Sequence, residues 1–95
     1  MDLKPFLKQL HAVCRTSNVA MLGVFGPVAR GEDTPESDID LLVKLSKPIG
    51  FIELIQLEDK LKEIFGRKVD LATEGALHPL IRQGVFNDLK VIYEK

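Results

Sequence analysis

The stretch that decides the fold is residues 19–43, which read VAMLGVFGPVARGEDTPESDIDLLV. It opens with an apolar run at 19–25, whose length and composition predict a strand buried on both faces. Gly26-Pro27 ends that strand, and residues 28–30 are predicted to form a short helical turn. After a polar loop, residues 38–44 alternate with period two, which predicts a second strand with one apolar face.

Two aspartates begin this second strand, although aspartate is a poor strand residue. Side chains two residues apart on a strand point to the same side, so the carboxylates of Asp38 and Asp40 can converge on one hard cation. Mg²⁺ fits this chemistry, because it takes oxygen ligands and is usually completed by water and substrate phosphates. Taken alone, the two aspartates are more simply explained as residues of a solvated strand edge. The neighbouring sequence has to decide between that explanation and a metal site.

Two neighbouring features favour the metal-site interpretation. Gly26 lies between a strand and a helical turn, where a glycine lets the backbone approach a phosphate; a plain tight turn is the alternative. Residues 69–73 predict a third strand, which carries Asp70. That acid could share the metal or take a proton from a hydroxyl nucleophile, or it could be an ordinary edge-strand aspartate. The three signals are more telling together than separately.

The rest of the chain completes an α/β layout, expected to form a single domain over residues 1–95. The first predicted helix has its apolar face from Leu3 to Cys14 and is ended by Ser17-Asn18. Two further helices and a final strand are predicted at 51–65, 77–86 and 90–93. Phe51 is placed on the apolar stripe of its helix, and the helix after it is expected to be interrupted near Pro79 and Gly84.

Composition excludes several classes of function. Thirteen Lys and Arg against fourteen Asp and Glu give a net charge of -1, so no direct nucleic-acid binding is expected. The apolar runs are far short of the ~20 residues that a membrane helix needs, and no export signal is seen. Because Cys14 is the single cysteine, an internal disulfide is excluded. Cys14 is expected to be a small residue of the hydrophobic core. A cytoplasmic protein without a membrane partner is expected.

The segments GVFGPVARG (23–31) and SDIDLLV (37–43) resemble the signature of the minimal nucleotidyltransferases, small relatives of the DNA polymerase β superfamily. That signature is Gly-Ser, ten residues and then Asp-x-Asp, with a third acid on a later strand. Here Gly26 takes the glycine place, ten residues run from Val28 to Ser37, and the acid pair follows. Asp70 matches the third acid, and the resemblance covers nearly the whole chain.

The resemblance implies a polymerase β-like fold, in which helices pack against a small mixed sheet. It also implies transfer of a nucleoside monophosphate from an NTP, with ATP the expected donor, to a hydroxyl, with two Mg²⁺ ions between the acids. Asp38 and Asp40 would bind both ions, and Asp70 would bind the one that activates the acceptor. Small members of the family usually pair with a HEPN-domain protein, which implies an antitoxin role and a protein acceptor; self-association is left open.

Pro27 stands where the family signature has serine. Serine would offer a hydroxyl and an N–H to the triphosphate, and proline offers neither. The nucleotide is still expected against Gly26, Pro27, Arg30 and Ser37, although Arg30 could be an exposed loop residue and Ser37 could merely bond the turn backbone. Pro27 therefore leaves a second function open, in which the chain has a degenerate site and neutralises a HEPN partner by contact.

Other candidates have simpler explanations. Lys44 lies on the face of the acids but is better explained as a solvated lysine at a strand end, and His11 and His78 as surface or helix-end residues. Phe86, Val91 and Tyr93 are expected to pack in the core, with a partner-binding patch as the alternative. We expect the three carboxylates to converge on one sheet face, and any partner surface to be apolar and separate from them.

Overall fold

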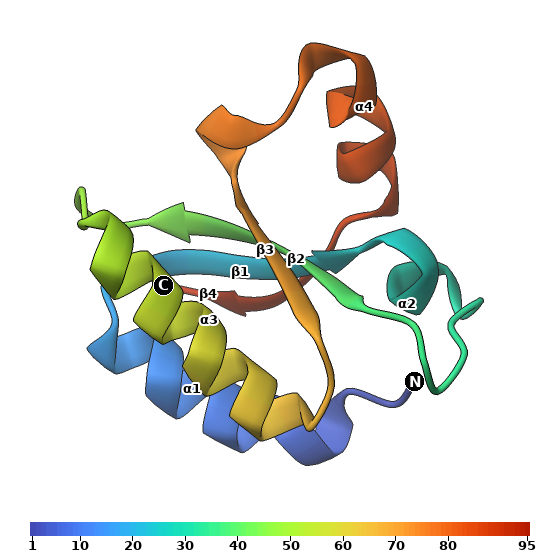
Figure 1. Ribbon diagram of the computed structural model, residues 1–95, viewed down its shortest axis with the longest axis horizontal. Helices are drawn as coiled ribbons and strands as arrows, with labels where there is room; N and C mark the ends of the chain where they lie inside the picture. Colours follow the sequence, from blue (N-terminus) through green and yellow to red (C-terminus); the bar gives the residue numbers. More distant parts are fainter.

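The computed structural model describes residues 1–95 and is built on a four-stranded mixed sheet in the order β3-β2-β1-β4. The central strand β1 (Val19–Phe25) is antiparallel to both of its neighbours, β2 (Ile39–Leu45) and β4 (Lys90–Glu94). The edge strand β3 (Val69–Thr73) lies parallel to β2. This small mixed sheet with packed helices is the expected α/β architecture (Figure 1).

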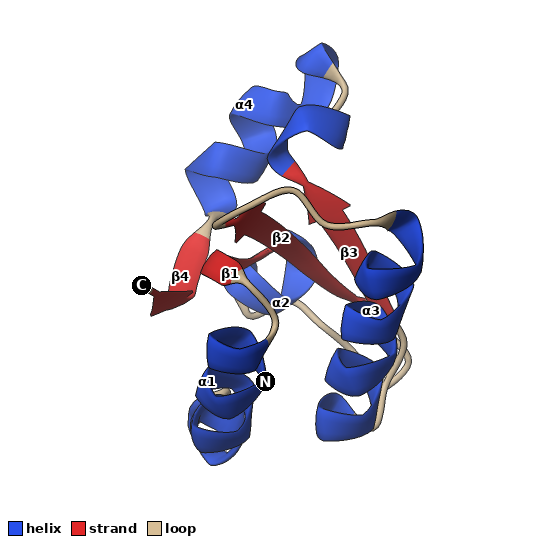
Figure 2. Cartoon of the chain, turned by 90° about the vertical axis from the view of Figure 1, so that its left-hand side faces the viewer, coloured by secondary structure: helices blue, strands red, loops and turns tan.

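Helices cover both faces of the sheet. On one face α1 (Leu7–Thr16) and α3 (Phe51–Phe65) lie side by side, and on the other face lies α4 (Pro79–Asp88), as Figures 1 and 2 show. A single turn, α2 (Gly26–Arg30), follows β1 directly. Because parallel strands cannot be joined by a hairpin, α3 serves as the crossover between β2 and β3. Two short 3₁₀ turns complete the chain, at Lys4–Phe6 and Glu74–Ala76.

The sheet separates two hydrophobic cores. The larger core lies against α1 and α3 and includes the fully buried Leu10, Leu41 and Leu61. The smaller core lies under α4, where Leu42 packs with Val85. Successive residues of a strand point to opposite faces, so Leu41 and Leu42 serve different cores. The residues that share the α4 face with Leu42 include Asp40, and this places the acid on the side of the sheet away from α1 and α3.

The strands follow the predicted pattern closely. The apolar run forms β1, which is buried along nearly its whole length, and the alternating segment forms β2. The final segment is a strand, β4, as expected. Cys14 is buried in the main core, and this burial raises the pKa of its thiol to about 11. The thiol is therefore protonated at neutral pH and acts as a core residue.

Three details of the helices differ from the prediction. The first helix begins at Leu7, because Lys4–Phe6 forms a 3₁₀ turn around Pro5. Gly84 does not interrupt α4, since a glycine costs a helix only about 1 kcal/mol and the neighbouring Val85 is anchored in the smaller core. Proline suits a first helical turn, so α4 begins at Pro79 instead of breaking there.

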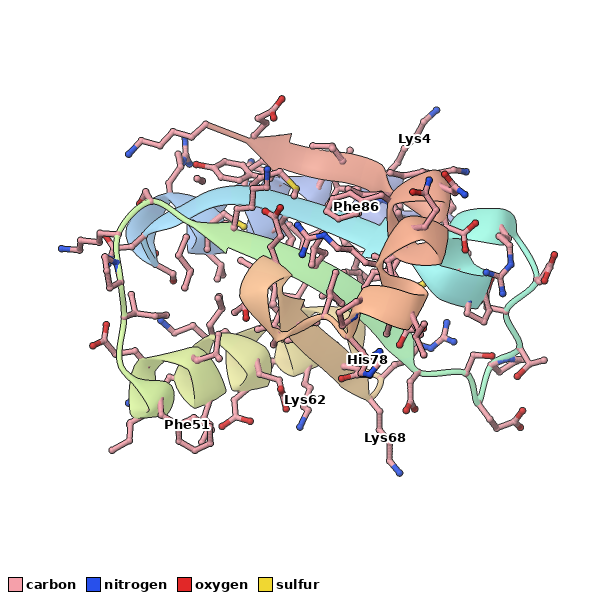
Figure 3. All side chains as sticks on the ribbon, turned by 90° about the horizontal axis from the view of Figure 1, so that it is seen from above. Lys4, Phe51, Lys62, Lys68, His78 and Phe86 are labelled. Atoms are coloured by element: carbon pink, nitrogen blue, oxygen red, sulfur yellow. The ribbon has the colours of Figure 1, made fainter.

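Phe51 was expected on the buried stripe of its helix, but its side chain is 76% exposed. It is the first residue of α3 and projects at the outer edge of the molecule in Figure 3. Ile52 beside it is 71% exposed, and Leu80 at the start of α4 is 86% exposed. The molecule therefore carries exposed apolar side chains on two helices. None of its helices has the length and apolarity to cross a membrane.

Candidate active site

The turn between β1 and α2 brings the backbone close to an acid. Phe25 ends β1 directly opposite Asp40 on β2. Gly26 then adopts a left-handed conformation with φ of +71°, which favours glycine. A Cβ atom added at Gly26 would collide with Oδ2 of Asp40. Only glycine therefore fits this turn without moving the carboxylate of Asp40, while the approach of this backbone to a phosphate stays a prediction.

The parallel register of β2 and β3 places two of the acids side by side. Asp40 is the direct partner of Asp70, and their strands pair from Ile39–Val69 onward. Residues that pair directly in a parallel register point to the same face of the sheet, so Asp40 and Asp70 share one face. Neighbouring strands are about 4.8 Å apart, which keeps the two residues close. Asp38 lies two residues before Asp40 and just outside the strand. The register thus brings Asp40 and Asp70 to the face that α4 partly covers, with Asp38 close by in sequence, just before β2 begins.

The acids influence one another electrostatically. The pKa of Asp40 is raised, first by burial and then by the charges of Asp70 and Asp38, while Arg30 acts in the opposite direction. Yet no three acidic, histidine or cysteine side chains stand at metal-ligating spacing. Three anions that repel one another are not expected to gather without a cation between them. Convergence of the three carboxylates on one point therefore stays a prediction.

The carboxylate groups of the three acids are chemically suited to binding a magnesium ion. All three candidate ligands are carboxylates, which supply the hard oxygen atoms that Mg²⁺ prefers. The pKa of Asp40 is raised first by burial and then by the charges of Asp70 and Asp38, and a cation at this place would neutralise those charges. The two hollows on the surface lie elsewhere, one between the end of α1 and α3, the other at the far ends of β2 and β3. Asp38 and Asp70 are exposed and Asp40 is half-buried, so the acid face is open to solvent.

Arg30 lies near the acids but is already engaged by two other carboxylates. Its Nη1 donates to Oδ2 of Asp88 at 2.5 Å and its Nε to Oε2 of Glu32 at 3.2 Å. These hydrogen bonds raise the pKa of the guanidinium, the one to Asp88 most strongly. Asp88 ends α4, so this ion pair ties α4 to α2. The sequence analysis missed Asp88, which lies 58 residues away and has no local pattern that marks it.

The other two nucleotide-site candidates differ in their surroundings. Pro27 lies in the first turn of α2, next to Gly26, where a proline is compatible with the helix. Ser37 turns its hydroxyl into its own loop, where Oγ accepts from the backbone N–H of Thr34 at 2.8 Å. This bonding matches the alternative explanation for Ser37. The hydroxyl is not free for a ligand in this arrangement.

Arg67 is a further residue that the sequence analysis missed. It precedes β3, and its guanidinium reaches back to the loop before Asp38. No local signal distinguishes it, because its partners lie some thirty residues earlier.

The simpler explanations hold for three other residues. His78 caps α4, with Nδ1 accepting from Leu80 N–H at 3.1 Å, and its place is labelled in Figure 3. His11 is an exposed residue of α1 whose ring bonds the carbonyl of Ile92. Lys44 is exposed and pairs with Glu74 at 3.4 Å. None of the three contacts the acids.

Replacing Asp40 with asparagine is expected to leave the fold as stable as the native chain at pH 7, or more stable. Because the folded pKa of Asp40 is raised above 3.8, its ionisation costs stability above that raised value. The advantage of Asp40→Asn should shrink as the pH falls through the raised pKa toward 3.8, where the unfolded chain also takes up the proton. Urea unfolding between about pH 3 and pH 7, with a chelator present, measures this.

Asp33→Asn is the matched control with the opposite sign. The N-terminal ammonium, and to a smaller extent Arg67, hold the pKa of Asp33 below 3.8. The stabilisation of the fold by the Asp33 carboxylate is therefore present at neutral pH, and it is lost as the pH falls through that lowered pKa. A loss of stability in Asp40→Asn at pH 7 would contradict the prediction and would mean that Asp40 serves the fold through hydrogen bonds.

Comparisons with known proteins agree with this geometry. The family model of the nucleotidyltransferase domain matches residues 3–92. A candidate protein adenylyltransferase of Methanocaldococcus jannaschii is 39% identical over 88 residues, covering 92% of this chain and 87% of that protein. The protein adenylyltransferase MntA of Thermococcus cleftensis is 34% identical over 71 residues, covering 75% of this chain and 72% of that protein.

Solved structures show the same fold. A candidate minimal nucleotidyltransferase superposes with a TM-score of 0.78 at 32% identity, covering 95% of both chains. A complex of a tri-AMPylated Shewanella oneidensis HEPN toxin with its MNT antitoxin matches with a TM-score of 0.73 at 18% identity, covering 99% of this chain and 74% of that one. The matched family model spans nearly the whole chain, so the chain belongs to the nucleotidyltransferase family, as a nucleotidyltransferase enzyme of the minimal, polymerase β-like kind.

Proposed function

We propose that residues 1–95 form a Mg²⁺-dependent nucleotidyltransferase that transfers AMP from ATP to a hydroxyl group of a protein partner. The observation that carries the proposal is the placement of Asp40 opposite Asp70, with Asp38 two residues before it, beside the close approach of Gly26. Relatives named as protein adenylyltransferases support both the reaction and the protein acceptor. The acceptor we propose is a HEPN-domain protein, with this chain acting as its antitoxin.

Each residue has a distinct task in the proposed reaction. Asp38 and Asp40 would hold the two magnesium ions, and Asp70 would share the one beside the acceptor. The ions would supply charge neutralisation for the triphosphate. Gly26 leaves room for the carboxylate of Asp40 at the β1–α2 turn, beside which a phosphate would bind. Asp70 accepts the proton of the acceptor hydroxyl. The hydroxyl oxygen then forms a bond to the α-phosphorus, the bond from that phosphorus to the bridging oxygen breaks, and pyrophosphate leaves.

Arg30 is proposed to contribute positive charge to the same face. Its charge acts against the net rise in the pKa of Asp40, so its field reaches the acids. Direct contact with a phosphate would require it to exchange Asp88 or Glu32 for the ligand. Ser37 is the weakest of the proposed nucleotide contacts, since its hydroxyl is bonded within its loop.

The exposed apolar residues support a protein partner. Phe51 and Ile52 lie on α3, on the face of the sheet opposite the acids, where partner binding would not cover the nucleotide. This position agrees with the expected separation of the partner surface from the acids. On the acid side of the sheet, α4 also exposes apolar side chains, namely Leu80, Ile81 and Phe86, so exposed apolar surface is not confined to α3.

The second candidate function is neutralisation of a HEPN partner by contact alone. Pro27 favours it, because the residue at this position can donate neither a hydroxyl nor a backbone N–H to the triphosphate. The three acids favour the enzyme, because carboxylates that repel one another serve no purpose in a surface that only binds.

The direct test is transfer of labelled AMP from ATP to a HEPN-domain protein with Mg²⁺ present. Asp70→Asn is expected to slow transfer by about 100-fold or more, the usual contribution of a general base. Asp59→Asn, an exposed acid on α3, should leave the rate unchanged. Tight partner binding without any transfer by the native chain would establish the contact-only function instead.

Gly26→Ala and Gly31→Ala form a matched pair for the nucleotide site. Both glycines have φ near +70°, so an alanine at either position is expected to cost about 1–2 kcal/mol of stability. A Cβ at Gly31 would meet nothing within 4 Å, whereas at Gly26 it would displace the carboxylate of Asp40. Calorimetry should therefore show that only Gly26→Ala loses binding of Mg²⁺ with AMP-PNP. Equal binding by the two variants would remove Gly26 from the site.

Pro27→Ser is expected to strengthen binding of Mg²⁺ with AMP-PNP by roughly 10- to 150-fold, since one hydrogen bond to a charged group is worth ~1.5–3 kcal/mol. Stability should fall by less than ~1 kcal/mol, because proline restricts the unfolded chain. Side-by-side titrations of both versions, with and without Mg²⁺, measure the change. Equally tight binding would show that the serine donors are dispensable, and no binding by either would favour the contact-only function.

A further inference from the structure

Asp38 differs from the other two acids in how the fold holds it. The pairing of β2 with β3 begins at Ile39, so Asp38 lies before the first ladder pair. Asp40, in contrast, has a strand partner on each side, in Phe25 and Asp70. The direction of the Asp38 side chain is therefore not set by the sheet, and some other contact has to set it.

Two consecutive residues hold the peptide groups on both sides of Asp38. The carbonyl of Ser37, which shares a peptide plane with the amide of Asp38, accepts from Nη2 of Arg67 at 2.6 Å. The N–H of Ile39, in the next peptide group, donates to the carbonyl of Lys68 at 2.9 Å. A peptide group is planar, so anchoring both groups restricts the two backbone dihedrals of Asp38.

Arg67 is held in place by the rest of the same loop. Nη2 also donates to the carbonyl of Thr34 at 2.7 Å, and Nη1 lies 3.4 Å from Oδ2 of Asp33. The Arg67 side chain is 17% exposed and that of Asp33 only 9%, so their opposite charges compensate each other away from bulk water. One planar guanidinium thus spans the loop from residue 33 to residue 37, which a lysine with a single nitrogen could not do.

We infer that Arg67 is a positioning residue for Asp38, and that it couples the first acid of the site to the third. Arg67 and Lys68 lead directly into β3, whose second residue is Asp70. The segment that carries Asp70 therefore also orients Asp38, across the start of the parallel pair. Lys68 contributes only its backbone, since Figure 3 shows its side chain projecting away from the sheet. The expected effect of Arg67 on metal and nucleotide binding rests on the proposed function. The clamp, by which we mean the hold of Arg67 and Lys68 on the peptide groups around Asp38, does not.

The test combines a local and a functional measurement on Arg67→Met, Arg67→Lys and the control Asp33→Asn. Hydrogen exchange of the Ile39 amide, relative to amides inside β2, should accelerate about tenfold or more in Arg67→Met, since hydrogen bonds to a charged donor are lost. Binding of Mg²⁺ with AMP-PNP should weaken about tenfold or more, as for other residues that orient a metal ligand. Asp33→Asn removes only the 3.4 Å contact and keeps both carbonyl contacts, so it should change each quantity less than Arg67→Met does.

Arg67→Lys is expected to fall between the native chain and Arg67→Met, and it carries the test should the methionine variant fail to fold. Unchanged exchange at Ile39 in the Arg67 variants would overturn the inference. Faster exchange with unchanged binding would assign Arg67 to loop structure alone and would also overturn its role toward the metal. Should the native chain itself bind no Mg²⁺ with AMP-PNP, the proposed function fails, and the clamp is judged by the exchange data, which need no nucleotide.

Discussion

The parallel pairing of β2 with β3 is the constraint on which the candidate site depends. Asp40 lies opposite Asp70 only because the two strands run in the same direction in this register. A slip of one residue would turn Asp70 to the other face, toward α1 and α3. The register is held by the main core, in which Ile39, Leu41 and Val69 are buried against α3. Packing on one face of the sheet therefore determines the chemistry on the other.

Holding these acids together opposes folding, and the fold compensates with apolar burial. The raised pKa of Asp40 reflects burial and the charges of Asp70 and Asp38. The rest of β2 is strongly apolar, with Leu41, Leu42 and Val43 all buried. A strand that packs on both faces can tolerate one unfavourable residue at its beginning, where the side chain of Asp40 is only half-buried. Aspartate is locally unfavourable in a strand, and the proposed function accounts for its presence here where fold stability does not.

The arginines show two ways of organising an anionic site. Arg30 lies on the same side as the acids and shares its charge with Asp88 and Glu32, which ties α2 to α4. Arg67 makes its contacts on the loop, through the carbonyls of Thr34 and Ser37. The first moderates the charge of the acids, and the second determines the path of the backbone that presents one of them. Neither arginine could be exchanged for lysine without losing one of its simultaneous contacts.

The sequence by itself determined the elements and the residue types of the site. The apolar run of β1, the alternation of β2, the spacing of Asp38 and Asp40, and the position of Asp70 in a short strand are local features, and local periodicity is what a single sequence reveals. The likeness to the minimal nucleotidyltransferases depended on the same local segments. Gly26 was recognisable as a turn residue, although its contact with Asp40 was not.

Only the tertiary structure decided which side chains meet. The partners of Arg30 and Arg67 lie 58 and about thirty residues away, so their contacts depend on how α4 and β3 return to the sheet and not on any local pattern. The exposure of Phe51 could not be predicted from the sequence either. The period of the apolar residues predicts which face of a helix is apolar, but it does not predict whether the end of that helix is covered by the rest of the protein. Side-chain neighbours across long loops are set by packing of the whole chain, and packing is a property that no short segment of the sequence contains.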